Sequence, residues 1–400
     1  MIRFELKKIF ERKFNVAAMV VGYILFGICL YQYIAQAEYY SEEPGEKVYG
    51  LEAIRMSKEH TDRQTDVVSE TYMTSLIRDI QNQKMDLESD KAYTDLIRPL
   101  GDMFYFASKN YTDLQSETID VEALNKVDLS NGASFYEHRI QKVSDYLNRD
   151  FSYGNYSKAE KDFWMEKIEN VTVPFVWGDK AVMDMAWDII ALGTYLIVVV
   201  IICISSVFSS EYETGAAPLL LTTKYGKSRL IWAKVITAFL FSILYVGIAV
   251  IGSLGIIAIL LGFPGADLPI QLWNSVIPYD LTAMQVCLLN FGIVLLLTAA
   301  FTSILLSCSA NIHSSFIVLV IGFLLFIVPT YFHMSKSSGL WNHIYCLFPV
   351  WVMNLKRMLG SFISYDFGIV LSYLCMTVLV YAFVIVFAFV PIKKGFLRIK

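Results

Sequence analysis

A polar stretch between two long apolar runs carries the side chains best suited to ion pairing. Residues 208–234 read FSSEYETGAAPLLLTTKYGKSRLIWAK. Two carboxylates are followed by four cations, namely Glu211, Glu213, Lys224, Lys227, Arg229 and Lys234. Carboxylates beside a membrane exit can be held by basic side chains or helix N-termini of a partner. Gly215 would allow a sharp turn into a short helix, so this stretch is predicted to bind rather than to catalyse.

The sequence contains no recognisable catalytic or nucleotide-binding set. Gly226-Lys227-Ser228 approaches a phosphate-binding loop, but that loop needs a glycine five positions before Gly226, where Leu221 stands. The five histidines are scattered, and neither His-Glu-x-x-His nor Gly-x-Ser-x-Gly occurs. We therefore predict that this chain is not an enzyme, binds no metal or other cofactor, and does not bind ATP by itself.

Composition assigns the chain to the membrane proteins. Of its 400 residues 56% are hydrophobic and only 18% are charged, and the apolar residues gather in runs of membrane-spanning length. The first run has no small-residue cleavage pattern after it, so we interpret it as a retained span. All six cysteines lie in or beside apolar runs, which favours buried apolar thiols over disulfides.

These runs predict an all-α membrane protein with six transmembrane helices. The predicted spans are residues 15–35, 183–208, 230–262, 281–307, 315–332 and 368–390. At 1.5 Å per residue the third span would reach about 50 Å, beyond the ~30 Å hydrocarbon core. Its first turns should therefore protrude beside the polar connection at residues 209–229.

The N-terminal residues 1–14 have the pattern of a basic amphipathic helix. Apolar residues recur at helical spacing, while Lys7, Lys8, Arg12 and Lys13 lie largely elsewhere on the helix. Such a helix lies on a membrane surface and can bind anionic lipid.

Charge is distributed unequally along the chain. Residues 36–182 contain 28 acidic and 17 basic side chains, a net charge of −11, whereas the remainder carries a net charge of +7. Short basic flanks mark the cytoplasmic side of membrane proteins, and here they are the N-terminus, residues 224–234 and the tail at 391–400. We therefore expect residues 36–182 to form an extracytoplasmic domain.

This domain is predicted to be mostly helical and to hold its own core. Ser134-x-x-Glu137 and Ser157-x-x-Glu160 resemble capping boxes. Without cysteines, a domain of this size needs large apolar anchors, and the alternative use of its aromatic residues is a docking surface. The aromatic residues concerned are Phe104, Tyr105, Phe106, Tyr146, Phe151, Tyr153, Phe163 and Trp164.

Two further features lie near the predicted outer side. Asp184 and Asp188 share one face of the second span, where carboxylates are more commonly solvated by lipid headgroups than part of a cation or substrate site. Residues 333–367 are apolar and aromatic but are interrupted by Pro349 and by Lys356 and Arg357. This segment is long enough to enter the bilayer from outside and return.

The ordered pattern from Glu211 to Lys234 resembles the first cytoplasmic loop of ABC-2 type exporter permeases. The shared features are a Glu-x-Gly step, a leucine triplet, a Lys/Gly/Ser/Arg turn and a lysine opening the next span. In that family the loop forms a coupling helix that docks on an ATPase subunit, an N-terminal elbow helix borders the ATPase, and two re-entrant helices precede the last span. The resemblance assigns the coupling role to Glu211, Glu213, Gly215, Lys224 and Arg229.

The resemblance implies a permease in a bacterial cell membrane that exports an amphipathic peptide, antibiotic or lipid, with a role in bacteriocin or antibiotic resistance. Its partners would be ATPase subunits that bind the ATP, a second permease subunit and membrane lipid, with no nucleic acid. The large insertion at residues 36–182 departs from the simplest members. The alternative is a membrane sensor whose extracytoplasmic domain binds a ligand, which would not require ATP turnover.

Overall fold

The computed structural model describes residues 1–40, 47–62, 66–83, 97, 100–116, 118–129 and 134–397. This part of the chain is mostly helical with little sheet, and five of its helices are long and apolar enough to cross a membrane. They are Lys13–Ala35, Ala181–Glu213, Arg229–Leu261, Ala283–Asn311 and Tyr373–Leu397. The prediction of a mostly helical chain with several helices of membrane-spanning length is confirmed; these helices are compatible with a membrane-embedded protein.

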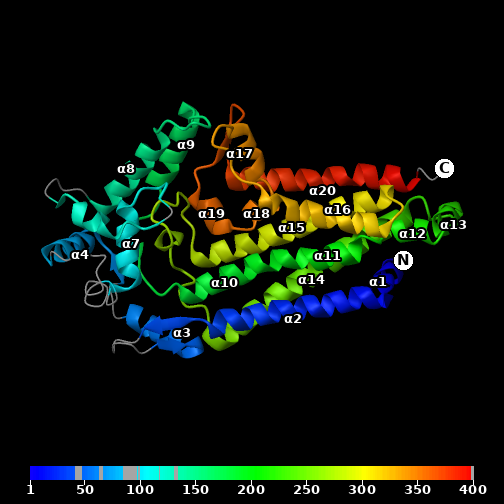
Figure 1. The fold of residues 1–400 in the computed structure, drawn as a ribbon, viewed down its shortest axis with the longest axis horizontal. Coiled ribbons are helices and arrows are strands. Elements are labelled where there is room, and N and C mark those ends of the chain that lie inside the picture. Colours follow the sequence, from blue (N-terminus) through cyan, green and yellow to red (C-terminus); the bar gives the residue numbers. More distant parts are fainter. Residues whose placement is uncertain are drawn as a thin grey trace.

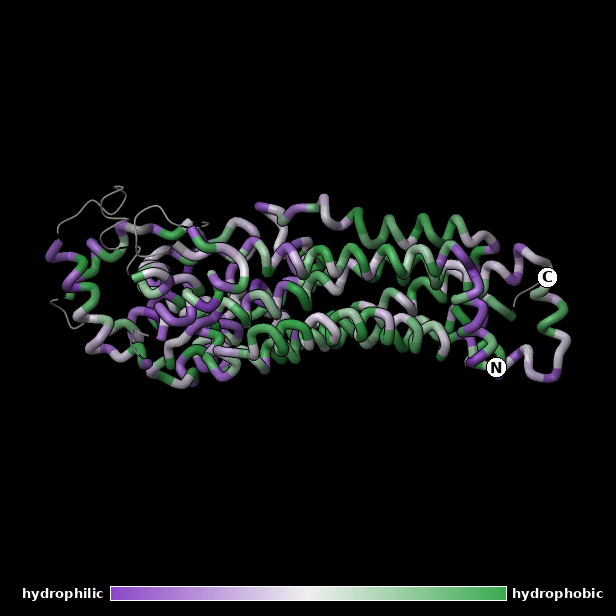
Figure 2. The backbone as a smooth tube through the Cα atoms, turned by 90° about the horizontal axis from the view of Figure 1, so that it is seen from below, coloured by the Kyte–Doolittle hydropathy of each residue, from purple (hydrophilic) through white to green (hydrophobic). Residues whose placement is uncertain are grey.

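The long helices lie side by side in an elongated bundle (Figure 1). Its members include α2 (Lys13–Ala35), α10 (Ala181–Leu192), α11 (Ile197–Ile204), α14 (Arg229–Leu261), α15 (Ala283–Asn311), α16 (Ser315–Ile327) and α20 (Tyr373–Leu397). Figure 2 shows a hydrophobic middle between two hydrophilic ends. One end carries both termini together with α1 (Ile2–Glu11), α12 (Ser209–Glu213) and α13 (Ala216–Thr222). The opposite end carries the domain inserted after α2.

Two predicted spans differ in character from the others. The second is interrupted by a 3-10 turn at Gly193–Leu196, between α10 and α11. Gly193 has no room for a side chain because Val250 of α14 lies against it, so the two helices approach closely here. The predicted span at 315–332 is α16 followed by a 3-10 turn at Val328–Tyr331, which together are shorter than the five long helices.

The helix of the predicted last span, residues 368–390, begins and ends later than the prediction. Residues 368–372 belong to a hairpin of β5 (Ser364–Asp366) and β6 (Val370–Ser372). Gly368 turns the chain at φ +84°, and its amide donates to the Asp366 carboxylate. The helix then continues through Pro391 to Leu397, so the predicted tail at 391–400 is helical as far as it is described; residues 398–400 lie outside the described part.

Helices also dominate the described part of the inserted domain. They are α3 (Gly50–Thr61), α4 (Glu70–Asn82), α7 (Asp102–Tyr111), α8 (Phe135–Leu147) and α9 (Lys158–Glu169). Two short antiparallel pairs join β1 (Glu38–Tyr40) to β2 (Lys47–Tyr49) and β3 (Val67–Val68) to β4 (Phe175–Val176). Ser157 and Glu160 form the complete capping box at the start of α9, whereas at α8 the Ser134 side chain accepts from the Glu137 amide.

The inserted domain has cores separate from that of the bundle, but residues outside 36–182 help to form them. Leu268 and Leu272, from the connection between α14 and α15, are buried in the core formed by α4, α7 and α8. Val276 from the same connection and Phe362 complete the core between α8 and α9. The buried Arg139 donates to the Ser275 carbonyl at 3.3 Å. The connection is therefore a structural part of the inserted domain, because it supplies apolar side chains that the domain lacks.

Candidate functional site

A cluster of four charged side chains joins three helices at the end of the bundle that carries both termini. Lys234 of α14 places its Nζ 2.7 Å from Glu5 Oε2 and 2.7 Å from Glu211 Oε1. Lys8 Nζ lies 2.8 Å from the same Glu211 oxygen and 3.3 Å from Glu5 Oε1. Lys234 also donates to the Val207 carbonyl at 2.9 Å. The cluster thus ties α1, α12 and α14 together.

These charges are buried and balanced. The side chain of Lys234 is 1% exposed, and those of Glu5 and Glu211 are 6% and 8% exposed. Burial alone would lower the pKa of Lys8, but its hydrogen bond to Glu211 and the charge of Glu5 raise that pKa above its ordinary value. Removing one member of a buried pair leaves an uncompensated charge, which typically costs about 3–5 kcal/mol. The arrangement therefore specifies one relative position of the three helices.

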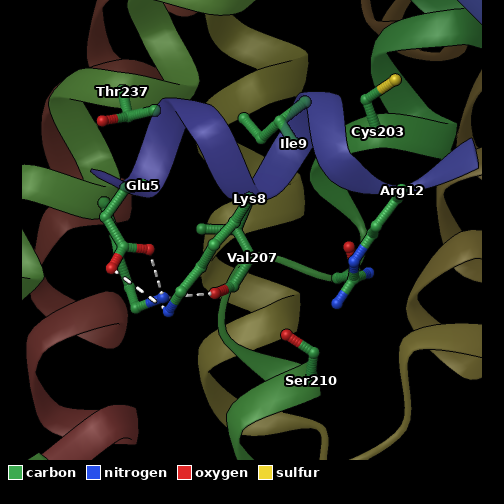
Figure 3. Close-up of a pocket in the computed structure, with 10 residues that line it drawn as sticks. Glu5, Lys8, Ile9, Arg12, Cys203, Val207, Ser210 and Thr237 are labelled. Carbon is green, nitrogen blue, oxygen red and sulfur yellow. Dashed lines mark hydrogen bonds and ion pairs between the residues drawn. The ribbon is translucent and has the colours of Figure 1, made fainter. Parts of the chain in front are cut away.

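Local structure turns α1 toward the cluster. Arg12 has an extended backbone (φ −77°, ψ 110°) that separates α1 from α2. The Asn15 side chain covers the end of α1 by donating to the Ile9 carbonyl at 3.1 Å. In Figure 3, Glu5, Lys8 and Arg12 extend from α1 toward the segment with Val207, and a cavity of about 30 Å³ lies among them.

A serine network positions Glu211. Residues 205–208 form turns rather than regular helix between α11 and α12. Ser309 Oγ of α15 accepts hydrogen bonds from the amides of Phe208 and Ser209, each at 3.0 Å, and donates to the Ser205 carbonyl at 3.0 Å. The buried backbone groups of this irregular segment are therefore hydrogen-bonded to Ser309. These bonds fix the direction in which α12 leaves the bundle.

Glu213 is held by a helix N-terminus of its own chain. Its carboxylate accepts from the Ser315 amide at 2.6 Å and from the Ser315 hydroxyl at 2.9 Å, at the first residue of α16. A carboxylate in this position interacts favourably with the helix dipole. Tyr212 donates to the Ala310 carbonyl at 2.8 Å, which fixes α12 against α15 as well. The hypothesis that a partner holds Glu211 and Glu213 therefore needs correction, because residues of the same chain already do so.

The three other predicted coupling residues, Gly215, Lys224 and Arg229, are exposed. Gly215 adopts the left-handed conformation (φ +67°) that permits the turn from α12 into α13. On α13, Leu219 is 72% exposed. Lys224 and Arg229 flank the ring of Tyr225, at 5.6 Å and 4.5 Å from its centroid. An apolar side chain and an aromatic ring between two cations thus protrude from the end of the bundle.

The predicted surface cations of α1 divide into two groups. Lys8 turns inward to the buried cluster. Lys7 forms an exposed i,i+4 pair with Glu11 at 3.2 Å, and Arg12 and Lys13 are also exposed. Phe4, Phe10 and Phe14 are 62%, 50% and 68% exposed, which suits contact with an apolar phase beside the cations.

At the opposite end, Asp184 and Asp188 share an ion-pair partner that the sequence analysis does not predict. Lys356, from the segment between α16 and α20, pairs with Asp184 and lies 3.5 Å from Asp188. Its ammonium group also lies 5.2 Å from the centroid of the Trp187 ring. These side chains are about one-third to two-fifths exposed.

Sequence reasoning missed the two partners that complete the buried cluster. Glu5 was overlooked among the cations of α1, although its i,i+3 spacing from Lys8 predicts a pair. Lys234 was recognised only as the lysine that opens an apolar span. A lysine inside an apolar run needs a buried anion as its partner, so the position of Lys234 predicts a nearby carboxylate.

No protein-family model, curated protein or solved structure matches this chain. Among the described residues, no group of three or more His, Cys, Asp or Glu side chains is arranged to hold a metal ion. The chemistry visible at the cluster is ion pairing and hydrogen bonding between helices. Such contacts hold the three helices at fixed positions relative to one another.

Proposed function

We propose that this chain is the permease subunit of an ABC-type exporter, in which separate subunits bind and hydrolyse ATP. The observation that carries the proposal is the buried cluster of Glu5, Lys8, Glu211 and Lys234. It connects the exposed α12–α13 segment to α1 and to a membrane-spanning helix. A displacement of α13 by a partner would move α14 and α1 with it, because separating them would expose unpaired buried charges.

The proposal includes a topology of six spans. The sixth helix is α16 with its 3-10 turn, of 13 and four residues, which lies near the lower limit of about 17 residues for a span. Both termini and α12–α13 would face the cytoplasm, consistent with the basic flanks, and the inserted domain would face outward. Three short helices, α17 (Gly339–Cys346), α18 (Pro349–Val352) and α19 (Leu355–Gly360), would form the re-entrant segment.

Within this proposal the coupling residues have different tasks. Glu211 and Glu213 hold α12 against the bundle, and Gly215 supplies the turn into α13. Lys224 and Arg229 contact the ATPase, together with the exposed Leu219. The elbow helix α1 and the start of α2 rest on anionic lipid through Lys7, Arg12 and Lys13, while Lys8 secures α1 to the cluster.

The substrate we propose is an amphipathic peptide, antibiotic or lipid, and resistance to a bacteriocin or antibiotic would be the biological role. The hydroxyls of Thr298, Thr302 and Ser303 support this, because each donates to a carbonyl one turn earlier in α15. These polar groups are satisfied by their own helix and leave a largely apolar face. A second permease subunit would complete the pathway.

Copurification from mild detergent tests the proposal. An ATPase subunit should copurify with the wild-type chain, and Lys224→Glu with Arg229→Glu should release it. Glu211→Gln should leave the ATPase bound but abolish the dependence of ATP turnover on the permease. Lys158→Glu is the matched control, since it changes an exposed cation at the opposite end.

The proposal fails if no ATPase copurifies and the variants behave as wild type. The sensor alternative would then be examined through ligand binding by the extracytoplasmic domain.

A further inference from the structure

A large cavity lies far from the cluster of Glu5, Lys8, Glu211 and Lys234. It has a volume of about 850 Å³ and separates the loop between α8 and α9 from the segment that contains α17 and β5. Both parts project from the end of the bundle opposite the termini (Figure 1). Cavities of about 300–1,000 Å³ are typical of small-molecule sites.

The walls of this cavity are fixed to one another. The Ser152 hydroxyl donates to the Lys336 carbonyl at 2.5 Å, and the Ser364 hydroxyl donates to the Glu160 carboxylate at 2.8 Å. Gly339, at the start of α17, has no room for a side chain because the backbone of the α8–α9 loop lies against it. The cavity is therefore formed before any ligand enters, which lowers the cost of binding.

The charge of this cavity is unbalanced toward positive. Both carboxylate oxygens of Glu160 already accept hydrogen bonds, one from Ser364 and one from the Ser157 amide. Lys336 and Arg357 line the cavity, and no carboxylate of the described residues pairs with either. The neighbouring Lys356 differs, because two aspartates neutralise it. Two exposed cations are left to attract an anion.

The remaining wall offers aromatic faces. Tyr146 packs with Tyr156 and Phe362 at centroid distances of 6.2 Å and 5.7 Å, and all three line the cavity. Trp351 lies 4.6 Å below the guanidinium of Arg357. Aromatic residues of the inserted domain and of the segment between α16 and α20 thus line the same cavity as the two cations.

We infer that this cavity binds an amphipathic organic anion, with its apolar or aromatic body against Tyr146, Tyr156 and Trp351 and its anionic group at Arg357 and Lys336. The ligand class follows from charge complementarity and from an aromatic wall suited to stacking. This binding requires neither ATP nor a partner subunit, so the inference stands apart from the exporter proposal.

Two fluorescent probes with the same ring body test this inference. 8-Anilinonaphthalene-1-sulfonate carries a sulfonate, and N-phenyl-1-naphthylamine is its uncharged counterpart. The full chain is placed in phosphatidylcholine nanodiscs, and the signal of empty nanodiscs is subtracted. The anionic probe should bind saturably, and Lys336→Gln with Arg357→Gln should weaken it at least tenfold while changing the neutral probe less than twofold. Trp351→Leu should weaken both probes.

The inference is overturned if the anionic probe only partitions as it does into empty nanodiscs, or if the double variant binds it as tightly as wild type. Equal weakening of both probes by the double variant would also overturn it. Thermal unfolding verifies that each variant is folded. If Arg357→Gln does not fold, Lys336→Gln alone must still weaken the anionic probe at least threefold, because its side chain is exposed.

Discussion

The two ends of the bundle use charge in opposite ways. At the end with the termini, Glu5, Lys8, Glu211 and Lys234 balance one another and three of them are almost fully buried. At the other end, Lys336 and Arg357 face a cavity without a carboxylate partner among the described residues. Balanced buried charges fix helices in place, whereas unbalanced open charges are available to a ligand. The same residue types therefore hold helices together in one place and, under our proposal, bind a ligand in the other.

The largest effect should come from Lys234→Met. This change leaves Glu5 and Glu211 as buried anions without their common cation, and we expect the free energy of unfolding to fall by about 3–5 kcal/mol. Denaturant unfolding in mixed micelles measures it. Lys227→Met is the control, since that exposed side chain lies outside the cluster and should cost less than about 0.5 kcal/mol. Equal losses in the two variants would show that the cluster does not fix the helices.

A smaller effect should follow from pH at Lys142, a partly buried lysine of α8. Burial and the charge of Lys109 lower the pKa of Lys142 to about 8 in the folded chain, against about 10.4 when unfolded. Between these values the unfolded chain holds the proton and the folded chain does not, so stability rises with pH. The rise is at most about 3 kcal/mol.

Thermal unfolding from pH 8 to pH 10 measures this effect, with Lys142→Gln as the reference. The wild-type protein should gain stability relative to the variant across the window. If the stability of the wild-type protein and of the variant changes with pH in the same way, Lys142 is not desolvated. The contrast between buried and exposed cations would then not extend to the inserted domain.

Lys356→Met should have an intermediate effect of about 1–2 kcal/mol, because the Asp184 and Asp188 side chains that it pairs with are partly exposed. Salt distinguishes the two ends further. At 1 M salt the loss of unfolding free energy caused by Lys356→Met should shrink, because exposed pairs are screened. The loss caused by Lys234→Met should persist. Equal sensitivity to salt at both ends would contradict the difference in burial.

The smallest effect is expected for Lys7→Ala. Lys7 pairs with Glu11 on the exposed side of α1, where both side chains are more than half exposed. Such pairs typically contribute less than about 0.5 kcal/mol. The unfolding midpoint should therefore match wild type within error, and a loss comparable to that of Lys234→Met would mean that α1 is held by its surface face instead.

The long helices could be predicted because an unbroken apolar run determines both their length and their character. Helix α14 covers Arg229–Leu261, one residue from the predicted 230–262. The hairpin before α20 escaped prediction because its second strand, Val370–Ser372, merges into the apolar run of the helix. Only Gly368, which turns the chain, marks the strand as separate from the helix.

The charges of the candidate site could be predicted as a group, but their contacts could not. The sequence places Glu211 in a charged stretch, yet the Lys234 ammonium group pairs with Glu5, 229 positions away along the chain. Such a pair depends on how α1 folds back over α14. Periodicity describes each helix separately, so it gives no information on which faces meet.

The shared core of the inserted domain has a consequence for the order of synthesis. Residues 36–182 leave the ribosome before Leu268, Leu272, Val276 and Phe362 exist, although these residues complete the two cores of that domain. Chains grow from the N-terminus, and domains generally fold as they emerge. Leu268, Leu272 and Val276 are made only after α10, α11 and α14, and Phe362 only after α15 and α16 as well. The two cores can therefore be completed only after these helices have been synthesised.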